Sequence, residues 1–268
     1  MASESSAEPW LKLDTTVAHS ARVYDYWLGG KDNFAADREA GDRVIAIRPT
    51  IRSDVRENRA FLRRAVRFLA ADAGIRQFLD IGTGLPSAGN THEVAQEIAP
   101  DSKVVYVDND PLVLAHARAL LTGTPGTTAY LSADLREPGK ILRDAADGLD
   151  FSQPVGVMLV AVLHHITDAE DPAGIIETLM AAVPPGSYLV ISHPAADVQT
   201  EAVAQVAEQY NRHVATGQTR RTREQVTGFF GGLEVLPPGV VQTPQWSPEV
   251  PPSGLPVPMW AGVARKSG

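Results

Sequence analysis

Short apolar runs alternate with amphipathic stretches through the middle of the chain. Strand-like segments are expected at 77–81, 103–107, 128–131, 154–163 and 187–192. Helical periodicity separates them at 91–98, 112–121, 140–146 and 173–183. This alternation predicts parallel β-α-β units, and the near-continuous apolar strands indicate a sheet covered on both faces.

The N-terminal part follows a different pattern. Residues 1–15 are polar and are expected to form a flexible leader. Residues 18–47 are helical with an interruption at Gly29 and Gly30, and 51–72 predict a longer amphipathic helix. We therefore divide the chain into the leader 1–15, an N-terminal helical cap over 16–73 and an α/β domain over 74–268.

The C-terminal third is less regular. Residues 198–214 are helical, and Thr222 with Gln225 forms a capping box for a short helix that follows. Two further strands are expected at 233–236 and 259–264, as a hairpin with a proline-rich connection.

Composition narrows the classes of function. The chain has 268 residues, a formal net charge of −8 and no cysteine, which excludes disulfides, cysteine metal sites and a thiol nucleophile. The acidic balance disfavours a broad nucleic-acid surface, so no nucleic-acid partner is expected. No apolar run reaches the roughly 20 residues of a membrane span, and the N-terminus lacks a signal peptide. We expect a cytoplasmic protein without a membrane partner.

The most informative segment is the glycine turn that follows the first strand, FLDIGTGLPS over 78–87. Gly82 and Gly84 permit tight turns and close approach of a ligand, a common arrangement at the carboxyl end of an α/β strand. A pyrophosphate fingerprint needs a third glycine where Ser87 stands, after Pro86. The turn therefore favours a nucleoside ligand without phosphates.

Carboxylates follow the next two strands as well. Asp108 ends the second strand, where an acid can accept hydrogen bonds from both ribose hydroxyls. The alternative is that Asp108 or Asp110 only caps the helix that begins at Pro111. Asp134 follows the third strand and suits an adenine amino group, with the Leu135 amide for a ring nitrogen.

Taken together, these segments resemble the class I S-adenosylmethionine-dependent methyltransferases. The matching segments are FLDIGTG (78–84), VVYVDND (104–110), SADLRE (132–137), VMLVAVLHHI (157–166) and PPGSYLVIS (184–192). Leu85 and Pro86 depart from the family, which often has a further glycine after the turn. SARVYDYWLGGKDNFAADREAGDRV (20–44) and REN (56–58) also look like a bacterial S-adenosyl methyltransferase family of unassigned substrate.

The resemblance implies a Rossmann-like seven-stranded α/β fold, mostly parallel, with an antiparallel C-terminal hairpin and the helical cap over the cofactor. It implies S-adenosylmethionine as the cofactor, with the amino-acid end near the glycine turn, the ribose on Asp108 and the adenine on Asp134. The cofactor contacts expected on this basis are Asp80, Gly82, Thr83, Gly84, Asp108, Asn109, Asp134, Leu135 and Ala161.

Aromatic and polar residues of the cap suggest a lid over this cleft. We expect Tyr24, Lys31 and Asn33 to contact cofactor or substrate, while Trp27 is expected to anchor the cap. His164 is a tentative general base after the fourth strand, although a His-His pair can simply end that strand, and methyl transfer need not use a base.

A basic cluster lies later in the chain. It could clamp an anionic substrate group or form a solvated helix face. Its members are Arg212, His213, Arg220, Arg221 and Arg223.

Two main hypotheses follow. The first is a methyltransferase acting on a small-molecule acceptor, without a metal. The second is a catalytically silent S-adenosylmethionine-binding sensor or partner subunit. A nicotinamide-dependent oxidoreductase is disfavoured by Pro86 and Ser87. The sequence does not distinguish a monomer from a dimer.

Overall fold

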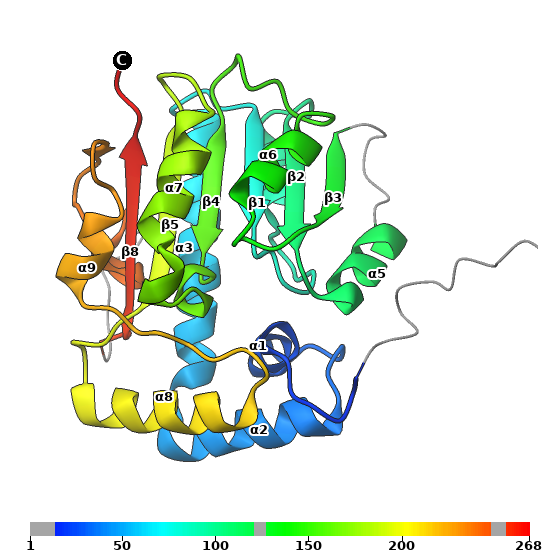
Figure 1. The fold of residues 1–268 in the computed structure, drawn as a ribbon, viewed down its shortest axis with the longest axis vertical. Coiled ribbons are helices and arrows are strands. Elements are labelled where there is room, and N and C mark those ends of the chain that lie inside the picture. Colours follow the sequence, from blue (N-terminus) through cyan, green and yellow to red (C-terminus); the bar gives the residue numbers. More distant parts are fainter. Residues whose placement is uncertain (1–13, 121–126, 248–255) are drawn as a thin grey trace, which may run out of the picture.

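A twisted sheet forms the centre of the molecule in the computed structural model, which describes residues 14–120, 127–247 and 256–268 (Figure 1). Its order is β3-β2-β1-β4-β5-β8-β6, with β7 paired to β8. Strands β1 to β5 are parallel, and β8 is antiparallel to β5, β6 and β7. The strands are β1 Gln77–Ile81, β2 Lys103–Asp108, β3 Thr128–Ser132, β4 Gly156–Val160, β5 Tyr188–Pro194, β6 Glu234–Val235, β7 Val241–Gln242 and β8 Met259–Arg265.

The predicted parallel sheet with an antiparallel C-terminal part is confirmed, but seven strands is the wrong number. The described residues form eight, because β7 adds a pair to β8 within the segment expected to be a connection. Two residues are too few to show an alternating pattern in the sequence. Strand β4 is also shorter than predicted, since Ala161 has a positive φ of 53° and a 3₁₀ turn, η2 Leu163–His165, follows.

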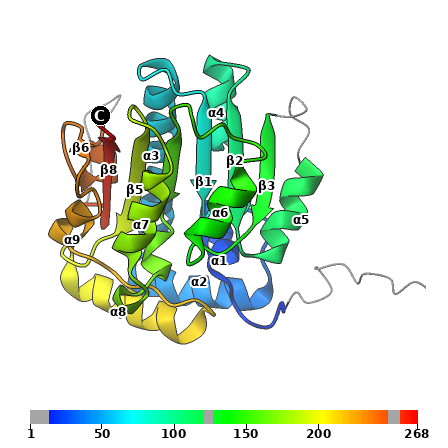
Figure 2. The same ribbon diagram turned by 45° about the horizontal axis from the view of Figure 1, so that its top comes forward.

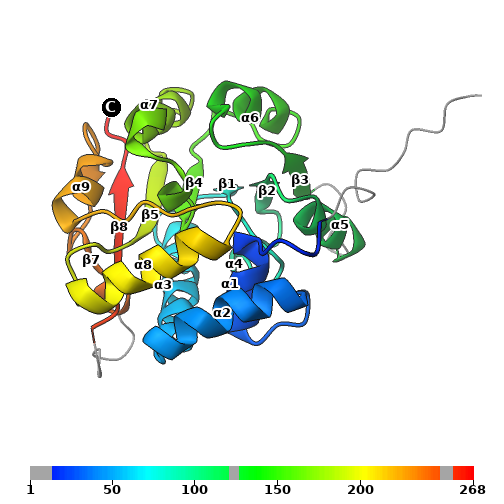
Figure 3. The ribbon, with the colours of Figure 1, turned by 60° about the horizontal axis from the view of Figure 1, so that its bottom comes forward.

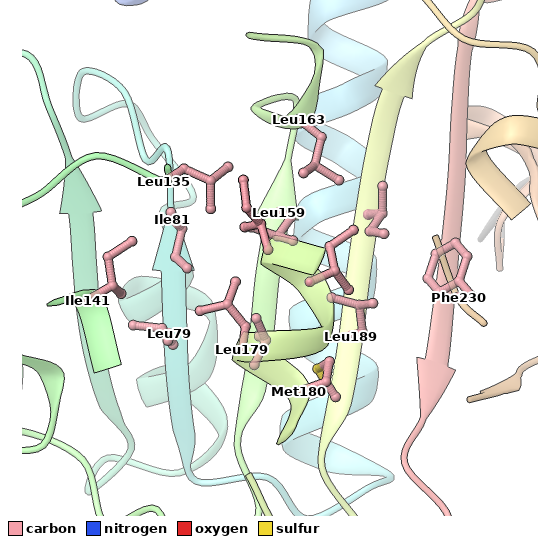
Figure 4. Close-up of a cluster of buried hydrophobic side chains, with 14 of the residues drawn as sticks. Leu79, Ile81, Leu135, Ile141, Leu159, Leu163, Leu179, Met180, Leu189 and Phe230 are labelled. Carbon is pink, nitrogen blue, oxygen red and sulfur yellow. The ribbon is translucent and has the colours of Figure 1, made fainter. Parts of the chain in front are cut away.

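Helices cover both faces of the sheet (Figure 2). They are α1 Ser20–Leu28, α2 Ala35–Ile47, α3 Ile51–Ala71, α4 Thr91–Ile98, α5 Pro111–Leu120, α6 Pro138–Ala145, α7 Pro172–Ala181, α8 Thr200–His213 and α9 Arg223–Gly228; two further 3₁₀ turns are η3 Asp168–Glu170 and η4 Thr243–Gln245. Along β1, Leu79 and Ile81 belong to an apolar cluster that includes residues of α6, α7 and α9, while Phe78 belongs to a second cluster with residues of α3 and α4. Figure 4 shows the first of these two clusters. Burial on both faces explains why β1, β2, β4 and β5 are mostly apolar, whereas β3 at the edge of the sheet is half-buried.

A third apolar cluster lies beyond the carboxyl ends of the parallel strands. It joins α1, α2 and the start of α3 to α8 (Figure 3). Trp27 packs against Tyr210 of α8 with ring centroids 6.2 Å apart, and Ala18 forms a β-bridge with Val214. The expected anchoring position of Trp27 agrees with this packing.

The layer over the strand ends therefore combines elements from both ends of the sequence. Helix α8 lies beside α2, although about 150 residues separate them along the chain. Helix α3 extends from this layer along the back of the sheet in Figure 1. Phe61 and Leu69 of α3 are fully buried. The boundary between a cap at 16–73 and a domain at 74–268 stays a prediction, and most of the expected leader lies outside the described residues. No helix in the described ranges is both long and apolar enough to cross a bilayer.

Candidate active site

A cavity of about 200 Å³ separates the carboxyl ends of β1 to β5 from α1, α3 and α8. Most of the residues expected to contact a cofactor line it together. They are Tyr24, Asp80, Gly82, Thr83, Gly84, Asp108, Asn109, Asp134, Leu135 and Ala161, joined by His164. Lys31 and Asn33 do not line it.

The glycine turn is fixed to the neighbouring strand. The Gly82 and Thr83 amides donate to the Val107 carbonyl at 2.8 and 3.3 Å. Gly82 has φ +74°, and a Cβ there would lie 2.2 Å from Val162 Cγ2. Gly84 has φ +65°, with no heavy atom within 4 Å of such a Cβ. The first glycine is therefore required by packing, while the second leaves space on the cavity wall.

Asp108 is tied to the glycine turn. Its two oxygens accept from the Gly84 amide at 2.8 Å and the Asp110 amide at 2.9 Å. Burial raises the pKa of Asp108, against the opposing effect of these two hydrogen bonds. Each carboxylate oxygen keeps acceptor capacity beyond one bond, so Asp108 can still accept from ligand hydroxyls.

Asp110 caps helix α5, which is the alternative that the sequence left open for it. It accepts from the Leu112 amide at 2.9 Å and lies 2.9 Å from His19 Nδ1. It is 2% exposed and does not line the cavity. Two neighbouring carboxylates of similar burial thus have different surroundings, and only Asp108 is available to a ligand.

Asp80 is a second buried carboxylate on the cavity wall. Thr91 Oγ1 donates to it at 2.6 Å. Burial raises the pKa of Asp80 to about 6, with a further contribution from Asp108, while Thr91 and Arg59 act in the opposite direction. A cationic group placed beside this carboxyl would favour its ionised form.

Arg59 of α3 is a lining residue that the sequence did not single out. It donates to the Gly89 carbonyl at 3.2 Å and Asn90 Oδ1 at 3.1 Å, and its Nε is buried without a partner. In the sequence, Arg59 looks like a solvent-exposed residue, because it lies on the arginine-rich face of an amphipathic helix. Together, Asp80 and Arg59 put opposite charges beside the glycine turn.

The residues expected at the adenine contact each other. Asn109 Nδ2 donates to Asp134 at 3.1 Å, and the Arg136 amide donates to the same carboxylate at 2.9 Å. Burial alone would raise the pKa of Asp134, but these hydrogen bonds outweigh it and the pKa is lowered. Leu135 is buried beside it. An ionised acceptor therefore stands at the end of β3.

Tyr24 is held by a hydrogen-bonded chain across three elements. Its hydroxyl donates to the Val55 carbonyl at 3.2 Å and accepts from Asn58 Nδ2 at 2.9 Å. Asn58 Oδ1 in turn accepts from Ser192 Oγ at 2.6 Å. Asn58 belongs to the REN segment, so this segment connects α1 through α3 to β5.

Lys31 and Asn33 lie in the loop after α1. Asn33 Nδ2 donates to Asp25 at 2.8 Å, and Asp25 itself lines the cavity. Lys31 is exposed. Contact of Lys31 or Asn33 with a bound ligand stays a prediction.

His164 lies in η2, directly after β4. Burial lowers its pKa well below the usual value, aided by nearby His165, His193 and the arginines that follow α8. Its Nδ1 is buried without a partner. At neutral pH the ring is therefore neutral and suited to form a hydrogen bond with a bound ligand. Its low basicity limits its use as a general base.

The basic cluster at the end of α8 and in the segment after it divides among three environments. Arg221 is buried, and donates to Asp168 at 2.7 Å and to the Leu163 and Ile166 carbonyls at 3.2 and 2.8 Å. These bonds hold the loop that carries His164. Arg220 lines the cavity, whereas Arg212 is exposed and pairs with Glu208. Within the described ranges, no group of three His, Asp or Glu side chains is placed to hold a metal ion.

Comparison with known proteins identifies the family of this chain. A family model described as S-adenosyl methyltransferase matches residues 6–267. A DUF574 family protein from Streptomyces avermitilis is 44% identical, with a TM-score of 0.91 over 94% of this chain and 99% of that one. A candidate methyltransferase from Thermobifida fusca is 42% identical, with a TM-score of 0.89 over 97% and 98%.

More distant structures share only the fold. Human N-acetylserotonin methyltransferase, solved with S-adenosylmethionine, is 15% identical with a TM-score of 0.50, over 91% of this chain and 62% of that one. A search of curated proteins found no match. The match over nearly the whole chain shows that the protein belongs to the S-adenosyl methyltransferase family.

Proposed function

We propose that this methyltransferase moves a methyl group from S-adenosylmethionine to a small-molecule acceptor bound in the same cavity. The observation that carries the proposal is that one cavity is lined both by the strand-end carboxylates and by side chains of α1, α3 and α8. A donor held at the strand ends and an acceptor held under the helices would share one cavity. Binding of both reactants in one cavity favours their alignment.

The chain's own residues fit the donor. Asp108 keeps acceptor capacity for ribose hydroxyls, and Asp134 is ionised at the position proposed for adenine. Asp80 and Arg59 offer opposite charges for an amino-acid end beside the glycine turn. Ser87, after Pro86, stands where a pyrophosphate site needs a third glycine, which weighs against a dinucleotide.

S-adenosylmethionine supplies an already activated methyl group on a sulfonium. The protein's task is then to exclude water, orient the acceptor and receive its hydrogen bond. Tyr24 and His164 are the polar side chains we propose for orientation, because both line the cavity and His164 has an unpartnered nitrogen. Metal assistance has no part in this proposal.

Calorimetry with S-adenosylmethionine and S-adenosylhomocysteine tests the donor site. Incubation of the protein with radiolabelled donor and a small-metabolite extract, followed by separation of labelled products, tests transfer. Binding with labelled product supports the proposal. Binding without transfer to any pool supports the silent sensor or partner subunit, and preferential thermal stabilisation by NAD would favour the oxidoreductase.

A further inference from the structure

The part of the cavity beyond the end of β5 differs from the wall at the strand-end carboxylates. Its lining includes residues of α1, the start of α3 and α8, and α1 and α8 lie side by side in Figure 3. In the sheet, β4 stands between β5 and the glycine turn of β1. Much of its lining is apolar, including Trp27, Leu28, Ile51, Val206 and Met259. We call this region the β5 end of the cavity.

Charged side chains of the β5 end are two arginines and one carboxylate. Arg48 is buried and is bonded to Asp54, to Gln199 Oε1 and to the Pro256 carbonyl. Arg48 and Asp54 thus neutralise each other, which leaves the charge of Arg220. Asp25, the other lining carboxylate under the helices, is bonded to Asn33 and the Asp32 amide on the opposite side.

Arg220 has few partners of its own. Within the described part of the chain it forms no ion pair, and its hydrogen bond to the Ala195 carbonyl is long, at 3.4 Å. Its Nε is buried without a partner. Burial and the nearby Arg48 lower the pKa of Arg220 to about 10, against the opposing effect of Asp54, so Arg220 remains charged at neutral pH. Arg220 is half-buried and shares Asp54 with Arg48, so its charge is only partly balanced. Such a charge is costly, and an anionic ligand would reduce that cost.

The orientation of Arg220 follows from its neighbour. Arg221 forms a β-bridge with Ala195, so the chain is extended here, and its guanidinium is fixed in the core by Asp168. Successive side chains of an extended segment point to opposite sides. Anchoring Arg221 therefore turns Arg220 toward the cavity, and the preceding loop has little freedom to withdraw it.

We propose that the methyl acceptor is a small, largely apolar monocarboxylate whose carboxylate is bound by Arg220. This inference rests on the proposed function, because it assigns the acceptor of the same cavity. A single guanidinium whose charge is only partly balanced matches one negative charge, and its planar fork fits a carboxylate. The apolar lining fits a hydrocarbon or aromatic body. His164, close enough to Arg220 to be influenced by its charge, would meet the portion to be methylated.

The test compares acids with their neutral amides on the full-length protein saturated with S-adenosylhomocysteine. Calorimetry would measure acetate, benzoate, phenylacetate and octanoate against acetamide, benzamide, phenylacetamide and octanamide. We expect at least one apolar acid to bind roughly 10- to 100-fold more tightly than its amide, the range of a charge-assisted hydrogen bond. Equal binding, or no binding, of acids and amides across the panel would overturn the inference without any variant.

Arg220→Gln tests the residue, with Arg212→Gln as the matched control on an exposed arginine that does not line the cavity. Arg220→Gln should lose the preference for acids while keeping its affinity for S-adenosylhomocysteine, and Arg212→Gln should match the wild type. Arg220→Lys keeps the charge but not the fork and should be intermediate, which serves if the Gln variant does not fold. Retained acid binding in a folded Arg220→Gln would overturn the role of Arg220. Failure of the wild type to bind S-adenosylhomocysteine would instead refute the proposed function.

Discussion

Replacing Asp108 by Asn separates its two expected roles, support of the glycine turn and binding of the donor. The wild-type carboxylate accepts one amide from Gly84 and one from Asp110. An Asn side chain of the same shape has one acceptor oxygen and one donor NH₂. One backbone N–H must therefore face another donor, at a site where the side chain is only 9% exposed.

The two consequences have different sizes. An unpartnered buried N–H costs about 1–3 kcal/mol, which the relief of a buried charge partly offsets, so the expected loss of stability is about 1–2 kcal/mol. Ligand binding loses the charged acceptor for two hydroxyls. We expect a loss of about 2–4 kcal/mol, or roughly 30- to 1,000-fold in the dissociation constant of S-adenosylhomocysteine.

Asp110→Asn is the control, since Asp110 is also buried, lies two residues away and is absent from the cavity wall. Urea unfolding would measure stability and calorimetry the dissociation constant for both variants. Asp110→Asn should lose some stability through the Leu112 amide and His19 while keeping wild-type affinity. Unchanged affinity in Asp108→Asn, or an equal loss in Asp110→Asn, would refute the assignment of the donor to Asp108.

Three further predictions concern the same wall and the loop behind it. The pKa of Asp80 rises from 3.8 unfolded to about 6 folded, so the folded protein holds this proton more tightly, and stability should fall by about 2 kcal/mol as pH rises from about 4 to 6. Urea unfolding should show a flatter pH profile for Asp80→Asn, and an unaltered slope would contradict this. Gly82→Ala should lower the free energy of unfolding by more than about 2 kcal/mol, because the added Cβ clashes with Val162, whereas Gly84→Ala should lower it by about 1 kcal/mol through backbone strain and should chiefly weaken donor binding. Similar free energies of unfolding for the two variants would contradict this prediction. Arg221→Met should cost roughly 2–4 kcal/mol by leaving buried carbonyls unpaired, and denaturation at the wild-type midpoint would contradict that value.

The donor half of the site could be predicted because parallel strands end at one edge. Asp80 and Asp108 lie at the ends of β1 and β2, and Asp134 follows β3. The apolar pattern identifies all three strands, so the convergence of these carboxylates needs only the alternation of strands and helices. The capping box of Thr222 and Gln225 was equally local and is confirmed. Features set within a few residues, or repeated along successive β-α units, are visible in a single sequence.

The position of Arg59 on the cavity wall could not be predicted from the sequence, for a physical reason. Four other arginines of the same helix are exposed, namely Arg52, Arg56, Arg63 and Arg67. Long-range hydrogen bonds to the Gly89 and Asn90 loop distinguish Arg59 from them. The short strand β7 was hidden because two residues carry no period. Long-range pairing decides both features, and local pattern does not encode such pairing.

The acceptor half depends on one long-range arrangement. Helix α8 packs onto α2 through an apolar cluster that ends at the bridge between Ala18 and Val214. The chain then runs directly to Arg220 and Arg221, which divide between the cavity and the core. The position of Arg220 is therefore fixed on one side by the packing of α8 and on the other by Arg221. A side chain whose position is fixed on both sides loses little conformational entropy when it binds a ligand. The specificity for a carboxylate proposed here would therefore arise from the packing of α8 on the N-terminal helices.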